Sequence, residues 1–79
     1  MPTVFVRKGF LFKFFSNEDH EPPHVHVIKG KADAKWWIDP TLEEEYSTGF
    51  KGQELRMIGS LLKENHHALL QAWKDHFNQ

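Results

Sequence analysis

Apolar and polar residues alternate over the first half of the chain, up to Ile38. A period of two places apolar side chains on one face of a β-strand. The residues that share a face in this way are Phe10, Phe12 and Phe14 in one segment and Ala32, Ala34, Trp36 and Ile38 in another. Short links that contain Gly9 and Gly30 separate these segments, which is typical of antiparallel hairpins. We therefore predict strands over 3–7, 10–15, 24–29 and 32–38, joined as a four-stranded antiparallel meander.

The apolar period lengthens to 3.6 residues after Gln53, which predicts helix. The apolar positions of this region are Leu55, Ile58, Leu62, Leu69, Trp73 and Phe77. One helix over 52–77 would be about 39 Å long. The expected radius of gyration is only about 12 Å, so that helix would overhang the body unless a dimer covered its end. We predict two helices instead, with Asn65 as the N-cap of the second.

The segment 41–48 links these two halves and is polar and acidic. Glu43, Glu44 and Glu45 are consecutive, and Leu42 lies four residues before Tyr46. Four residues is the spacing of one helical turn. We predict a solvated connector, in which this spacing is compatible with a single turn of helix. The alternative is that the three glutamates contact a basic surface of a partner. The whole chain, 1–79, is then one α+β domain whose two C-terminal helices pack on one face of the sheet.

The amino-acid composition excludes some classes of function. The chain has 79 residues, no Cys and a net charge of −1. No apolar run is long enough to cross a membrane, and the N-terminus lacks the pattern of a signal peptide. We expect a cytoplasmic protein that needs no disulfides. The nearly balanced charge does not favour general binding to nucleic acid, which normally requires a basic excess.

The stretch Glu21-Pro22-Pro23-His24-Val25-His26-Val27 carries the most distinctive chemistry. Two residues apart on a strand, His24 and His26 would point the same way with Cα atoms about 6.6 Å apart, while Val25 and Val27 point into the core. The pair could bind a metal ion together with His20, although we predict no cofactor. It could instead act as an acid/base pair on RNA, with Arg7, Lys8, Lys29 or Lys31 stabilising the phosphate.

Two further interpretations of the histidines stay open. They could form a protein-binding surface together with Lys35 and Trp37, because aromatic side chains anchor interfaces. They could also be ordinary solvent-facing residues of a half-buried strand. Trp36 and Trp37 are consecutive, so a strand sends one to each face. We expect one of them in the core and regard the other as the interface candidate.

Several segments together resemble a known family. They are Met1-Pro2-Thr3-Val4, Asn17-Glu18, the proline–histidine stretch, Ala34-Lys35-Trp36-Trp37, and Gly49-Phe50 ahead of Glu54-Leu55. The chain resembles the small bacterial family catalogued as domain of unknown function 4160. Lys51 stands where a Ser commonly precedes the helix in that family, and Lys offers no acceptor oxygen for a cap.

The resemblance carries no established catalytic residues. It implies a gene that lies beside one for a second small protein, in an arrangement similar to a toxin–antitoxin pair. We therefore expect a protein-binding member of a two-gene module rather than an enzyme. The alternatives are a small RNA-directed nuclease and a metal-binding domain. A homodimer is also compatible with the sequence.

Overall fold

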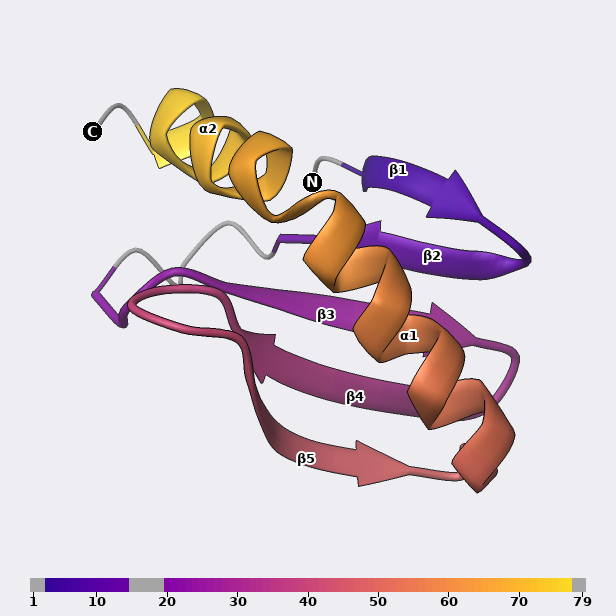
Figure 1. Cartoon of the computed structure of the whole chain (residues 1–79). Helices are drawn as coiled ribbons and strands as arrows, with labels where there is room; N and C mark the ends of the chain where they lie inside the picture. The colour runs from indigo at the N-terminus through magenta and orange to yellow at the C-terminus, as the bar shows by residue number, and fades with distance from the viewer. Residues whose placement is uncertain (1–2, 15–19, 78–79) are drawn as a thin grey trace.

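The computed structural model describes residues 3–14 and 20–77, and Figure 1 shows a twisted sheet with a helix lying across it. The elements are β1 (Thr3–Arg7), β2 (Phe10–Lys13), β3 (His24–Lys29), β4 (Ala32–Trp37), β5 (Glu43–Thr48), α1 (Gly52–Glu64) and α2 (His66–Phe77). The α+β class and the two C-terminal helices are confirmed. Phe15, which we assigned to the second strand, lies outside the described residues.

The sheet is an antiparallel meander with the order β1-β2-β3-β4-β5. It has five strands rather than the four predicted, because the acidic segment pairs with β4 instead of forming a connector. Glu43 lies opposite Trp37 and Tyr46 opposite Lys35, with an irregularity between these pairs. The prediction of a helical turn at Leu42 and Tyr46 is therefore wrong. β5 is an edge strand, where solvent can reach its carboxylates, so three consecutive Glu residues are tolerated there.

A two-residue turn joins β1 to β2. Lys8 and Gly9 both have positive φ, at 54° and 85°, between the paired residues Arg7 and Phe10. Two residues with φ above zero are characteristic of the type I′ turn, whose twist matches that of the flanking strands. This geometry is energetically unfavourable for Lys8, because a left-handed backbone conformation disfavours residues with a Cβ atom.

The hydrophobic core lies between the sheet and the two helices. Its buried members are Phe10, Phe12, Phe14, Val25, Val27, Ala34, Ile38, Ile58, Leu61, Leu62, Leu69 and Trp73. The face predicted from the period-two alternation is therefore the one that the helices cover. Gly59 of α1 faces Trp36, and a Cβ there would be in ordinary van der Waals contact with the indole ring, at 3.8 Å. The radius of gyration is 11.6 Å.

Helix α1 begins at Gly52 without a capping oxygen from Lys51, as predicted. Glu54 compensates in part. Its Oε1 accepts a hydrogen bond from the backbone N–H of Lys51 at 2.9 Å, and its Oε2 lies 3.6 Å from Nζ of Lys29. The hydrogen bond from Lys51, with a smaller contribution from the charge of Lys29, lowers the pKa of the Glu54 carboxyl below its ordinary value. Because both contacts favour the ionised form, Glu54 stabilises the start of α1 when it is charged.

The break between the helices falls at Asn65, as predicted. The carbonyl of Asn65 accepts the first bond of α2, from the N–H of Leu69 at 2.8 Å. Its side chain behaves differently from our expectation, because the amide Nδ2 donates to the carbonyl of Leu61 at 2.8 Å. The side chain of Asn65 therefore hydrogen-bonds to a carbonyl at the end of α1, and its backbone carbonyl accepts the first hydrogen bond of α2. Neither helix in the described part of the chain is long and apolar enough to span a membrane.

Candidate functional site

The face of the sheet opposite α1 holds the predicted site, and α2 reaches this face at His24. Directly paired residues of neighbouring strands share a face, and successive residues alternate, so the register assigns each side chain. We call this surface the helix-free face. It consists of Val6, Leu11, Lys13, His24, His26, Ile28, Asp33, Lys35, Trp37, Glu43, Tyr46 and Thr48. All four residues that we predicted for binding, His24, His26, Lys35 and Trp37, belong to it.

The two histidines lie together on this face but do not face solvent. Their ring centroids are 5.3 Å apart. His24 is 0% exposed and His26 only 7%, and Val25 and Val27 on the opposite face are fully buried as well. The interpretation of the pair as ordinary solvent-facing residues is therefore wrong: β3 is covered on both faces at this point.

His24 is buried because an element from the C-terminus reaches it. Among the described residues, β2 pairs with β3 as far as Lys13 opposite His26, and His24 lies beyond that pair. Trp73 of α2 packs there, with its ring 5.1 Å from the imidazole, and Trp37 lies 5.5 Å away on the other side. Two indole rings and a second imidazole thus enclose a histidine that sequence alternation alone would leave in water.

The imidazole of His24 is also held by a hydrogen bond. Its Nδ1 lies 2.9 Å from the carbonyl oxygen of Pro22. A carbonyl only accepts, so Nδ1 donates and carries the proton. This bond holds the imidazole against the Pro22–Pro23 segment that precedes β3. The carbonyl of Pro23 accepts a hydrogen bond from the N–H of Ile38 at 3.0 Å, which continues the ladder between β3 and β4. The two prolines and His24 therefore form one structural unit at the start of β3.

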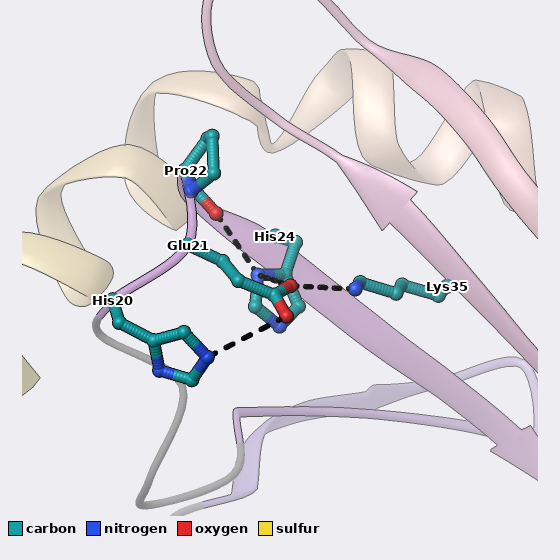
Figure 2. A network of polar contacts seen from close by, with 5 residues as sticks. All are labelled: His20, Glu21, Pro22, His24 and Lys35. Atoms are coloured by element: carbon teal, nitrogen blue, oxygen red, sulfur yellow. Dashed lines mark hydrogen bonds and ion pairs between the residues drawn. The ribbon is translucent and has the colours of Figure 1, made fainter.

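Glu21 is the centre of the polar network around this unit (Figure 2). Its Oε1 accepts from Nζ of Lys35 at 2.7 Å and lies 3.9 Å from Nδ1 of His24, while its Oε2 lies 3.7 Å from His20. The Lys35 side chain is only 12% exposed, and its ammonium group also lies 4.4 Å from the ring centroid of Trp37. The ion pair and the cation–π contact fix Lys35 and Trp37 in place on the helix-free face.

The remaining predicted site residues are not assembled with the histidine pair. Arg7 lies at the hairpin end of the sheet, with its guanidinium 5.6 Å from the ring of Phe5. Four to five residues of β-strand separate that end from His24, which is about 15 Å at 3.3 Å per residue. A phosphate at His24 would therefore be out of reach of Arg7.

His20 is the third predicted metal candidate, and its side chain is 70% exposed. Over residues 3–14 and 20–77, no group of three His, Asp or Glu side chains is placed to hold a metal ion. A third ligand from the loop before β3, Glu18 or Asp19, would lie outside the described residues.

Sequence reasoning missed three residues of this region. Tyr46 is 40% exposed on the helix-free face, Val6 is 59% exposed at its edge, and Trp73 closes over His24 from α2. The signal for Tyr46 was available, since it is the one aromatic residue in an otherwise polar, acidic segment. No local pattern marks Trp73, because helical spacing predicts its burial but not its neighbour.

Comparison with known proteins places the chain in a family. No curated protein and no solved structure matches it. Residues 9–74 match the family model described as Domain of unknown function (DUF4160), a span that includes β2, the Glu21–Val27 stretch, both tryptophans of β4 and most of α2. With that match extending over most of the sequence, the chain belongs to the DUF4160 family.

Proposed function

We propose that this domain binds a small protein partner, encoded by a neighbouring gene, through the helix-free face of its sheet. The observation that carries the proposal is the composition of that face. In a sheet covered by helices on one side only, the other side normally presents polar residues to water. Here Val6, Leu11, Ile28, Trp37 and Tyr46 bring apolar and aromatic side chains to that face, beside its charged and polar residues. Apolar residues gathered on a surface are typical of interaction sites.

The arrangement of Lys35 and Trp37 supports the same proposal. Both side chains are held by contacts within the chain, to Glu21 and to each other. Binding would therefore freeze few additional rotamers, which reduces the entropy lost on association. Tyr46 lies directly opposite Lys35 across β4 and β5 and offers a second aromatic anchor.

An RNA-directed enzyme gains no comparable support. A general acid or base must come within hydrogen-bonding distance of the reacting group. The ring of His24 is fully buried with Nδ1 turned to Pro22, and Arg7 lies at the far end of the sheet. The geometry instead assigns His24 to the support of the face, beneath the residues that would touch a partner.

The test is binding of the purified product of the neighbouring gene, measured by isothermal titration calorimetry. Tyr46 and Met57 form a matched pair, since each is 40% exposed but Met57 lies on α1, on the opposite side of the sheet. We expect Tyr46→Ala to weaken binding about tenfold or more, as for an aromatic anchor. Met57→Ala should leave the affinity unchanged.

Two outcomes would contradict the proposal. One is the absence of any complex between the two purified gene products. The other is a complex that Tyr46→Ala leaves intact and Met57→Ala disrupts, which would move the contact to the helices. Circular dichroism of both variants serves as the control for folding.

A further inference from the structure

Strand β1 offers a free edge next to the helix-free face. It is first in the strand order, so among the described strands it pairs only with β2. In a two-residue hairpin the closing pair exchanges both of its hydrogen bonds, and here that pair is Arg7 and Phe10. Val6 belongs to the next pair, in which the backbone groups point away from the partner strand. The N–H and C=O of Val6 are therefore directed to the outer edge of the sheet.

The two edges of the sheet differ in charge. The hairpin from Thr3 to Phe14 contains three basic residues, Arg7, Lys8 and Lys13, and no acidic one. The other edge strand, β5, contains Glu43, Glu44 and Glu45 and no basic residue, and all three carboxylates are exposed. Charged side chains on an edge strand protect it against pairing with further strands of like charge. The acidic edge is therefore protected against an acidic strand, whereas the β1 edge attracts one.

We propose that the partner adds an acidic, extended segment to β1 as a sixth strand of the sheet. This inference rests on the proposed function and specifies the chemistry of the partner. The backbone groups of Val6 would supply a pair of main-chain hydrogen bonds, the contact on which strand addition depends. Acidic side chains of the added strand would lie beside Arg7 and Lys8, at the hairpin end of β1. The regular edge is short, because an irregularity lies between Thr3 and Phe5.

A second copy of this chain fits the edge less well. Pairing two β1 strands about a two-fold axis would bring two basic hairpins together. Pairing β1 with the β5 edge of another copy satisfies the charges, but the contact is heterologous and generates a ring or an open chain of subunits rather than a two-fold dimer. A separate acidic partner avoids both difficulties.

The main test removes the outward N–H of Val6 from β1. Val6→Pro deletes that donor but breaks no bond to β2, and proline is tolerated on edge strands in this orientation. Val6→Ala is the matched control, because it shortens the side chain and keeps the N–H. We expect Val6→Pro to bind the neighbouring gene product about tenfold more weakly than Val6→Ala does, since one main-chain acceptor of the partner loses its donor.

A second pair of variants tests charge at the turn. Lys8→Asn and Lys8→Asp both suit a type I′ turn followed by Gly9, so neither should impair folding. They differ only in the added negative charge. We expect the affinity of Lys8→Asp to fall below that of Lys8→Asn, and the difference to shrink as the salt concentration rises.

A peptide probe makes the inference independent of the natural partner. The probe is a synthetic copy of residues 41–48, which is an acidic strand, and its control replaces the three Glu residues by Lys. We expect the acidic peptide alone to shift the backbone amide resonance of Val6 in an NMR titration. Absence of any shift with either peptide would overturn the inference.

The outcomes separate this inference from the proposed function. If Tyr46→Ala weakens the complex while Val6→Pro binds as well as Val6→Ala, the function stands and the strand addition is refuted. If the parent chain self-associates in analytical ultracentrifugation and Val6→Pro abolishes this, the occupant is a second copy, and the inference is likewise wrong.

Discussion

His24→Ala is the most direct test of the structure around the proline–histidine stretch. The substitution removes an imidazole that is 0% exposed and packed against Trp37, His26 and Trp73. Deleting a buried aromatic ring of Phe size costs about 3–5 kcal/mol, including the cavity that remains. The imidazole is smaller and more polar, so we assign about 2–3 kcal/mol to the lost packing. The hydrogen bond to Pro22 adds about 1 kcal/mol.

The expected total is therefore about 3–4 kcal/mol of unfolding free energy. A domain of 79 residues has a stability of about 4–12 kcal/mol, so the loss is a large fraction of the whole. The assay is urea denaturation followed by tryptophan fluorescence, because two of the three tryptophans contact the His24 ring. A change in fluorescence of the native state should accompany the loss of stability.

Two further variants make the reasoning refutable. His67 is an exposed histidine on α2, and His67→Ala should cost about 0.5 kcal/mol or less. His24→Phe keeps an aromatic ring, slightly larger than the imidazole, but loses the hydrogen bond to Pro22, so its cost should lie between those of the two alanine variants. If His24→Ala and His67→Ala were equally stable, the burial of the imidazole between the two indole rings would be wrong.

Other expectations follow from single contacts. Val25→Ala should lower the free energy of unfolding by about 1–3 kcal/mol in urea melts, because Val25 is fully buried under the helices; no loss would contradict that placement. Lys8→Asn should raise the free energy of unfolding by about 0.5–1 kcal/mol, since Asn tolerates the positive φ better. A lower free energy of unfolding would argue against the type I′ turn. The pKa of Glu54 is lowered in the folded state, so its contribution to stability is complete at neutral pH and is lost as pH falls through the folded-state pKa. Glu54→Gln should therefore have a lower Tm than the parent at pH 7 and an equal Tm once the carboxyl is protonated; a constant difference across the acid range would refute this. Dialysis against a strong chelator should leave the Tm within about two degrees, because a domain with an apolar core does not depend on metal binding for folding.

Residue alternation predicted the faces of the sheet correctly. Phe10, Phe12, Val25 and Val27 lie in the core, and Trp36 and Trp37 point to opposite faces, because the period of a strand is fixed by its backbone. The break at Asn65 was also predicted, although the Asn65 side chain donates to the end of α1 instead of capping α2. These features depend on neighbours in sequence, so the sequence was sufficient for them.

The errors concern contacts between distant segments. β5 was missed because its glutamates have low strand propensity, and at an edge that preference is overridden by pairing with β4. The burial of the histidines was missed because alternation assigns a side chain to a face without saying what covers that face. Trp73 lies 49 positions after His24 (73 − 24), and Glu21 meets Lys35 across a turn. Neither contact produces a periodic pattern in the sequence from which it could have been predicted.

The packing of Trp73 against His24 also has a kinetic consequence. Every strand pair in the meander joins neighbours in sequence, so each can form by closing a short loop. The contact between α2 and the start of β3 closes a much longer one, and long-range closures slow the folding of small domains. The sheet and α1 can therefore assemble before the C-terminal helix docks, and the last event buries the imidazole. During refolding, the environment of Trp73 should become native after that of Trp36. The packing around the start of β3 is then completed when α2, the final helix of the chain, docks.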